Sequence, residues 1–276
     1  LAPSRADAAS LELPAEWIDQ LKVLNPRFVV PSSCQFTQES WSWYRNRFFP
    51  ITYAQFRAEV EQALPNTRVI RLNPSVSVAL GGSSLEPAAA LPWVVPVGEQ
   101  DVDYRYDATT VPPHTAEIAR HFAELAPAET QLVLDYCQKG LLKKYEEMEL
   151  PEDSFFELAR IWSLSIYDHA GARTDFHYRV ERDTIALLDA PAHPLAWTTE
   201  VPASKLFAAL TQGEALTSMY MRINDSVFDA EIEEEIASAE IVDDPLIRCL
   251  FNDVFGAYQA AQLRRLKARA GGPSIS

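Results

Sequence analysis

The residues best suited to chemistry follow a short apolar run near the start of the chain. Ser33, Cys34 and Gln35 come after the apolar residues 28–30 and a proline at position 31. Such a run predicts a buried strand, and open α/β sheets bind their ligands beyond the carboxyl ends of their strands. A hydroxyl, a thiol and an amide at this place could hold a polar substrate. We therefore predict a substrate-binding site here, in which no catalytic residue can be named.

A loop rich in aromatic and basic residues comes next and extends the candidate site. It contains Trp41, Trp43, Tyr44, Arg45 and Arg47. The rings could stack on a sugar or a base while the guanidinium groups hold a phosphate. The alternative is a packed lid or domain seam, because aromatic side chains dominate ordinary cores and interfaces. The sequence leaves both interpretations open.

Cys34 is one of three cysteines, the others being Cys137 and Cys249. It could act as a metal ligand or a nucleophile, but a free cysteine at a strand end also suits the role of a small buried hydrophobic residue. The three are far apart and form no CxxC pair, so neither a disulfide framework nor a zinc knuckle is indicated. A reducing cytoplasm is the predicted location.

A second polar set lies further along the chain, on one face of a predicted strand. Asp175, His177 and Arg179 alternate with apolar residues and could bind a metal or a carboxylate, although a solvated strand face is the interpretation that we favour. The serines lack a nucleophile-elbow pattern with a histidine, which argues against a serine hydrolase. The acidic run 231–235 has no calcium-loop spacing.

The elements that must position the first site resemble the end of an α/β sheet. An amphipathic helix over residues 14–24 leads into the strand, and Thr52 is a predicted N-cap for a helix over 53–64. Residues 68–72 predict another strand. Because an open parallel sheet needs neighbours on both sides, we expect an N-terminal fragment or a second chain to complete the fold.

The remaining sequence predicts a second domain of the α+β class. Residues 1–110 would form the final α/β segment with a loop-rich wrap, and residues 111–276 an accessory domain with an antiparallel meander packed with helices. Predicted helices cover residues 115–125, 128–148 and 203–210 and begin again near 245, and predicted strands cover 93–97, 159–167, 175–180, 184–188, 197–201 and 216–223.

Composition narrows the function classes. The chain has 276 residues, 47% of them hydrophobic, and a formal net charge of -15. Excess negative charge opposes nucleic acid and anionic membranes. No apolar run approaches the roughly 20 residues that span a bilayer. We expect a cytoplasmic protein with a small-molecule substrate that binds neither nucleic acid nor membrane and could be a homo-oligomer.

The run VVPSSCQF, the aromatic loop and the FFPIT segment before a helix resemble the C-terminal segment of the metallo-β-lactamase-like fold. Within that fold, the resemblance is to the branch of sugar-nucleotide enzymes related to CMP-N-acetylneuraminate hydroxylase, and it covers about residues 14–75. The segment 197–223 is similar to a sterol-carrier-like accessory domain. The resemblance implies the end of an αββα sandwich and a metal-dependent hydrolase or oxidoreductase.

The metal chemistry implied by the resemblance needs residues from outside this chain. The superfamily binds metal through an HxHxDH motif, which is absent here. Ser33 stands where many relatives have a final histidine ligand. Zinc, iron or manganese would therefore need ligands from an N-terminal part, and we assign no metal ligand to this chain.

Two functions fit these observations. The chain could be part of a metal-dependent hydrolase-superfamily enzyme that acts on a small polar substrate, with phosphate or sugar groups among the candidates. Alternatively, it could be a non-catalytic ligand-binding or assembly module with a sterol-carrier-like apolar pocket. A first strand left exposed would favour the enzyme, and a closed sheet made from these residues alone would favour the module.

Overall fold

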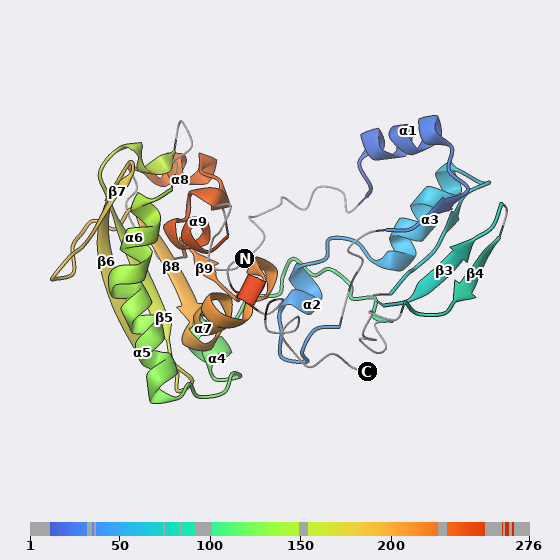
Figure 1. Ribbon diagram of the computed structural model, residues 1–276. Coiled ribbons are helices and arrows are strands. Elements are labelled where there is room, and N and C mark those ends of the chain that lie inside the picture. Colours follow the sequence, from blue (N-terminus) through green and yellow to red (C-terminus); the bar gives the residue numbers. More distant parts are fainter. Residues whose placement is uncertain are drawn as a thin grey trace, which may run out of the picture. The chain divides into compact units, whose positions relative to one another are not determined.

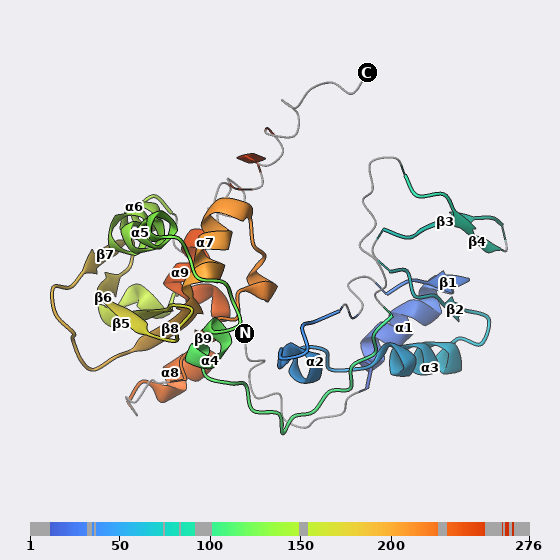
Figure 2. The same cartoon turned by 90° about the horizontal axis from the view of Figure 1, so that it is seen from below.

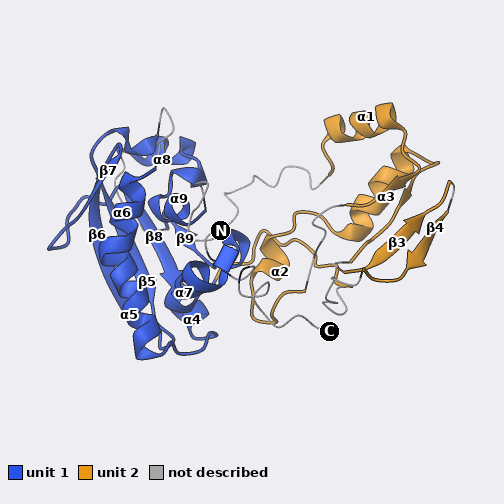
Figure 3. Ribbon diagram, in the orientation of Figure 1, with its two compact units in different colours: residues 1, 113–276 blue, residues 2–112 orange. Residues whose placement is uncertain are grey.

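The computed structural model describes residues 12–31, 35, 37–73, 75–82, 84–91, 101–148, 154–225, 231–251, 261, 263, 264 and 267. The chain divides into two compact units, unit 1 with residues 1 and 113–276 and unit 2 with residues 2–112 (Figure 3). Both contain helices and strands, and unit 1 has a mixed sheet, so the general α+β class is confirmed. None of the described helices combines the length and the apolar character needed to cross a bilayer.

Unit 2 is built from short elements around a parallel strand pair. Helix α3 connects strands β1 and β2, which pair in parallel with Phe28 opposite Arg68, and β3 pairs with β4 as an antiparallel hairpin (Figures 1 and 2). The elements are α1 (Ala15–Leu24), β1 (Phe28–Val29), α2 (Tyr44–Arg47), α3 (Tyr53–Ala63), β2 (Arg68–Val69), β3 (Ser77–Leu80) and β4 (Leu85–Ala88).

The predicted N-cap of α3 is confirmed. Thr52 is extended, and its Oγ1 accepts a hydrogen bond of 3.0 Å from the amide of Gln55. This bond pairs one of the amides that a helix leaves without an internal partner in its first turn. The helix buries Val60 and ends before Leu64, which is also buried.

Unit 1 has a five-stranded sheet in the order β7-β6-β5-β8-β9. Its strands are β5 (Arg160–Tyr167), β6 (Arg173–Glu181), β7 (Thr184–Leu187), β8 (Trp197–Pro202) and β9 (Arg222–Ile223). Its helical elements are α4 (Thr115–Ala119), α5 (Pro127–Asp135), η1 (Tyr136–Gly140), α6 (Leu141–Glu146), η2 (Phe155–Glu157), α7 (Ala203–Gln212), η3 (Leu216–Ser218), α8 (Glu233–Ser238), η4 (Ile241–Asp243) and α9 (Pro245–Phe251).

One face of this sheet carries the core of unit 1. Trp162 and Leu164 of β5 and Tyr178 of β6 are fully buried on it. Side chains of α5, α6, α7 and α9 complete the same cluster, and Figure 1 shows α5 and α6 lying over one face of the sheet. The opposite face is more polar and contacts α4, where Thr115 Oγ1 donates to Glu200 Oε2 at 2.5 Å. At about 25 cal/mol per Å², burial of these side chains is the main source of stability for unit 1.

Two predictions about unit 1 need correction, and one about unit 2 falls on residues that the structure does not describe. The meander is antiparallel only from β5 to β7, because β8 joins the free edge of β5 in parallel. The predicted strand 216–223 is the 3₁₀ turn η3 followed by the short strand β9, since Tyr220 adopts a φ of 53° that breaks an extended run. The predicted strand 93–97 lies outside the described residues.

The long predicted helix 128–148 is interrupted by the π-helix η1. A π-helix inserts an extra residue into the helical turn and often marks a special position. Here a side chain on Gly140 would place its Cβ 2.8 Å from the ring of Tyr136. The glycine therefore allows the Tyr136 ring to lie against the backbone. The hydrophobic pattern of the sequence did not predict this interruption of the helix.

Candidate functional site

Gln35 is the one member of the predicted strand-end trio that the structure describes, since Ser33 and Cys34 lie outside the described residues. Its side chain is 4% exposed. Gln35 Nε2 donates to the carbonyl oxygens of Tyr104 (2.8 Å) and Ile51 (3.2 Å), and Gln35 Oε1 accepts from the amide of Tyr104. A buried amide with these partners is held in one orientation.

The aromatic loop packs mainly against itself and its neighbours. Trp43 and Tyr44 are buried, with ring centroids 4.4 Å apart and the rings edge to face. Trp41 is half-buried. Phe49 is buried as well and lies against the ring of Tyr104. These contacts agree with the packed-lid interpretation of the loop and leave little ring surface for stacking on a ligand.

The two loop arginines bind parts of unit 2. The guanidinium of Arg45 lies 4.9 Å from the ring centroid of Tyr104, a cation–π contact. Arg47 Nη1 donates to the carbonyl oxygen of Thr110 at 2.8 Å, and among the described residues its buried Nε has no hydrogen-bond partner. Both guanidinium groups hold the loop to residues 104–110.

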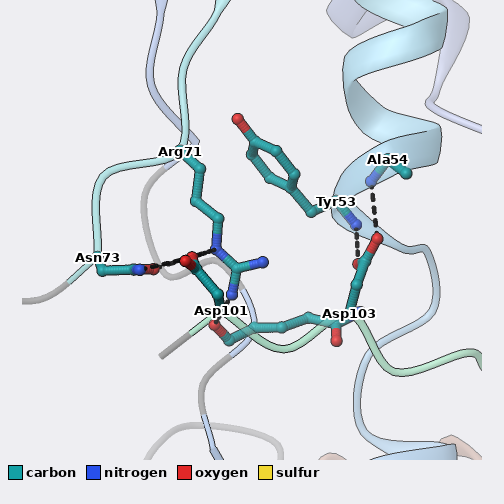
Figure 4. Close-up of polar contacts among 7 residues, drawn as sticks. Tyr53, Ala54, Arg71, Asn73, Asp101 and Asp103 are labelled. Atoms are coloured by element: carbon teal, nitrogen blue, oxygen red, sulfur yellow. Dashed lines mark hydrogen bonds and ion pairs between the residues drawn. The ribbon is translucent and has the colours of Figure 1, made fainter. Parts of the chain in front are cut away.

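A polar cluster that the sequence analysis missed centres on Arg71, just beyond β2 (Figure 4). Arg71 Nε donates to Asn73 Oδ1 at 3.0 Å and lies 3.6 Å from Asp101 Oδ1, and its Nη2 donates to the carbonyl oxygen of Gln35 at 3.3 Å. Its guanidinium also lies 5.3 Å from the ring centroid of Tyr53. Only 14% of the Arg71 side chain is exposed. The cluster joins the carboxyl ends of β1 and β2, which is where the sequence predicted a site.

The N-terminus of α3 completes this site. Asp103 accepts hydrogen bonds from the amides of Tyr53 (2.5 Å) and Ala54 (3.1 Å), as Figure 4 shows. A carboxylate at a helix N-terminus is stabilised by the helix dipole and by unpaired amides. The chain therefore places one of its own anionic groups at the positive end of α3.

This arrangement is suited to recognising polar groups through hydrogen bonds. Arg71 faces Asp101, so its positive charge is largely matched. The described residues form no group of three or more His, Cys, Asp or Glu side chains able to hold a metal. The described residues therefore do not form the metal centre that the resemblance implies, and no step through a metal is assigned to them.

The second predicted set, on β6, has the expected alternation. Phe176, Tyr178 and Val180 are buried, while Asp175 and Arg179 are exposed and His177 is half-buried. Asp175 accepts a hydrogen bond from Ser165 Oγ at 2.6 Å and pairs with Arg173 at 3.1 Å. The ring of His177 lies 6.4 Å from that of His193, and burial lowers the pKa of His177 from 6.5.

An open pocket of about 450 Å³ lies on unit 1 between η2, the start of β5 and η4. Arg160 covers the ring of Phe155 at 4.1 Å and pairs with Glu235. Glu157, Glu240 and Asp243 also line the pocket. The pocket is acidic, and its one described arginine already has a carboxylate partner.

A buried polar network lies at the N-terminus of α9. Asp244 Oδ2 accepts hydrogen bonds from Trp197 Nε1 (2.8 Å) and Thr199 Oγ1, and its Oδ1 accepts one from the amide of Ile247 (2.9 Å). Burial raises the pKa of the Asp244 carboxyl. Since three donors converge on it, the residue acts as a structural anchor between β8 and α9.

The two described cysteines are poor nucleophiles. Cys137 and Cys249 are buried and free. Burial raises the pKa of the Cys137 thiol to about 12 and raises that of Cys249 well above its ordinary value. Both thiols stay protonated near neutral pH and serve as small core side chains.

Comparison with known proteins adds no family assignment. No family model matches the chain, and no curated protein matches it. The chain is similar to the MycE methyltransferase of the mycinamycin biosynthetic pathway, solved with Mg and SAH, at 16% identity and a TM-score of 0.28, over 45% of this chain and 37% of that chain.

A second similar structure is Sterol Carrier Protein 2 Like 2 from Aedes aegypti. It has 14% identity and a TM-score of 0.26, over 40% of this chain and 98% of that chain. Likenesses this weak carry no argument about the fold or the function. The resemblances named from the sequence therefore stay predictions.

Proposed function

We propose that unit 2 is the terminal layer of a larger α/β domain, and that the completed domain is a metal-dependent enzyme of the metallo-β-lactamase-like superfamily acting on a small polar substrate. Most metal ligands would come from polypeptide outside this chain. Unit 1 would be its accessory domain. The metal assignment derives from the sequence resemblance, whereas the proposal that further polypeptide completes the domain is supported by the geometry of unit 2.

The main support for this proposal is the apolar surface of α1, which the described residues leave uncovered. This helix has no buried residue, and Trp17, Val23 and Leu24 are 58%, 87% and 74% exposed. Strand β1 has β2 as its neighbour in a sheet of two strands among the described residues. Parallel strands normally lie in sheets covered on both faces. A further strand beside β1 and a layer over α1 would satisfy both requirements.

The strand-end cluster would supply substrate recognition in the completed site. Gln35, Arg71 and Asn73 present amide and guanidinium groups at the carboxyl ends of β1 and β2, where ligands of open α/β sheets bind. Their contribution would be to orient polar groups of the substrate.

The alternative of a module with an apolar pocket has less support. The side chains that would have to line such a pocket in unit 1, including Trp162, Met219 and Met221, are fully buried against the chain's own helices. A ligand would have to displace them, which costs several kcal/mol for side chains of this size (~3–5 kcal/mol). Pairing of the α1 surfaces of two copies of the chain is a separate outcome that the experiment below distinguishes.

The test is native mass spectrometry and elemental analysis of the protein purified from the organism that encodes it. We expect additional polypeptide, covalently joined or bound, together with near-stoichiometric zinc, iron or manganese. Trp17→Ser should weaken binding of a separate partner. Leu158→Ser is the matched control, because Leu158 is 67% exposed but lies in unit 1.

A metal-free chain of 30.9 kDa that unfolds in one cooperative transition would contradict the proposal. A dimer of that chain without metal would instead favour assembly through unit 2. Neither result depends on knowing the substrate.

A further inference from the structure

Residues 101–110, here called the strap, lie over the strand-end site of unit 2 and fill its polar positions. Asp101 accepts a hydrogen bond from Asn73 Nδ2 at 2.7 Å, and Asp103 accepts those of the α3 amides. The backbone of Tyr104 hydrogen-bonds to both polar atoms of the Gln35 side-chain amide: its carbonyl oxygen accepts from Nε2 and its amide donates to Oε1. Three neighbouring positions of the site are thus occupied by three residues of one short segment.

The Tyr104 side chain occupies a fourth position. Its ring stacks on Phe49 with centroids 6.5 Å apart and an interplanar angle of 29°, and the Arg45 guanidinium lies over it. Its hydroxyl accepts a hydrogen bond of 3.1 Å from the amide of Gln38. The ring therefore covers part of the predicted aromatic and basic binding surface.

The far end of the strap is a small turn fastened to the aromatic loop. The amide of Asp107 donates to the carbonyl oxygen of Asn46 at 2.7 Å, and Asp107 Oδ1 accepts from the amide of Thr109 at 2.8 Å. Hydrogen bonds from Thr109 lower the pKa of Asp107. Arg47 holds the carbonyl oxygen of Thr110. The strap is fastened at both ends by polar contacts.

Polar contacts of this kind make a releasable attachment. The strap has no helix or strand, and none of its residues is fully buried. A typical hydrogen bond contributes only about 0.5–1.5 kcal/mol net, and segments with few buried apolar contacts open locally at a small fraction of the global unfolding free energy. The site beneath is different, because Gln35 is almost fully buried and oriented.

We propose that the strap is an autoinhibitory cover, which occupies the strand-end site with the chain's own carboxylates and tyrosine and opens as a unit to admit a ligand. This rests on the proposed function in one respect, that the strand ends are the binding site. Opening would release the two hydrogen bonds between Gln35 and the Tyr104 backbone, the contact of Arg71 with Asp101 and the bonds of the Tyr53 and Ala54 amides to Asp103. The strap and a ligand would then compete for the same groups.

Amide hydrogen exchange of the full chain, resolved by residue, tests this directly. The amides of Tyr104 and Asp107 report the two halves of the strap, because each donates a hydrogen bond to the site or the loop. We expect both to exchange much faster than the amide of Leu164 in β5. Asp103→Ala and Tyr104→Ala should each accelerate exchange of the remaining strap amides about tenfold, the equivalent of losing about one or two hydrogen bonds.

The controls separate opening from unfolding. Asp19→Asn, on exposed α1, should leave the strap amides unchanged, and the Val60 amide should keep its protection in every variant if α3 stays folded. Wild-type strap amides as slow as Leu164 would overturn the proposal. So would an Asp103→Ala variant that accelerates Tyr104 but not Asp107. Either failure leaves the co-purification test of the proposed function unaffected, and a failure there leaves the exchange result standing.

Discussion

The two units use similar local elements but differ in how far those elements are covered. Unit 1 has a sheet whose inner face is packed by four helices, so that Trp162, Leu206 and Leu250 are fully buried. The described part of unit 2 buries few apolar side chains and leaves α1 exposed. The buried apolar residues of unit 2 are Trp43, Tyr44, Phe49, Val60, Leu64 and Val69. Helices and strands form in both units, but among the described residues only those of unit 1 close an extended core.

The difference shows which forces hold each unit. In unit 1 apolar burial dominates, and polar groups such as Asp244 are satisfied within the core. In unit 2 the connections rely more on side-chain hydrogen bonds, including Thr67 Oγ1 to the carbonyl oxygen of Pro26 at 2.6 Å and Asp103 to α3. Since each such bond has a modest net value, unit 2 should be the first to open.

The largest expected effect contrasts two tryptophans. Trp162 stacks on Tyr178 at 4.7 Å and donates to Thr199 Oγ1, so Trp162→Ala should lower the free energy of unfolding of unit 1 by about 3–5 kcal/mol. Trp17→Ala should change stability by less than about 0.5 kcal/mol in the chain alone. Urea unfolding followed by circular dichroism measures both. If both variants lost the same free energy of unfolding, the proposed difference between the two units would be wrong.

Asp244→Ala should have the next largest effect. It leaves Trp197 Nε1, Thr199 Oγ1 and the amide of Ile247 without their common acceptor, and the loss should be about 2–4 kcal/mol. The exposed Asp189→Ala variant is the control and should unfold like the wild type. A thermal unfolding midpoint unchanged in Asp244→Ala would show that the network does not anchor α9.

Thr52→Ala tests whether unit 2 can be destabilised without an effect on unit 1. Loss of the N-cap should destabilise α3 by about 1 kcal/mol. Faster amide exchange in α3 should reveal it, with no change in β5. Thr52→Ser keeps the hydroxyl and should restore the wild-type rate. An effect that reached β5 would mean that the two units unfold together.

The smallest expected effect is a pH dependence in unit 1. Burial lowers the pKa of His177 in the folded state below 6.5. The unfolded chain therefore takes up the proton first, and the stability present above pH 6.5 is lost as the pH falls through the lowered pKa. Urea midpoints at about pH 7.5 and about pH 5.5 should differ less in His177→Gln than in the wild type. An identical difference in both proteins would contradict this sign.

The sequence predicted the elements with strong local signals. The N-cap at Thr52, the alternation along β6 and the helix start at Pro245 all depend on neighbours close in sequence. The parallel contact of β8 with β5 and the strand break at Tyr220 depend on distant packing and on one residue with positive φ. No local pattern encodes either of these.

The sequence pointed to the end of the first strand, but it did not point to most of the residues that form the polar cluster there. Gln35 was predicted because it follows an apolar strand. Arg71, Asp101 and Asp103 lie 36 to 68 positions after Gln35 in the sequence. A single arginine after a short strand is a weak signal. Two aspartates in a Pro- and Gly-rich region read as ordinary loop residues, so only tertiary structure brings them to α3 and Gln35.

The outer edge of β1, which has no strand partner among the described residues, and the apolar stripe of α1 also bear on how the chain behaves at high concentration. An unpaired strand edge beside uncovered apolar side chains is a template for self-association. The net charge of -15 opposes this near neutral pH by mutual repulsion between molecules. That repulsion vanishes near the isoelectric point of about 4.8. Mild acid should therefore turn unit 2 into the starting point of precipitation while the core of unit 1 is still folded.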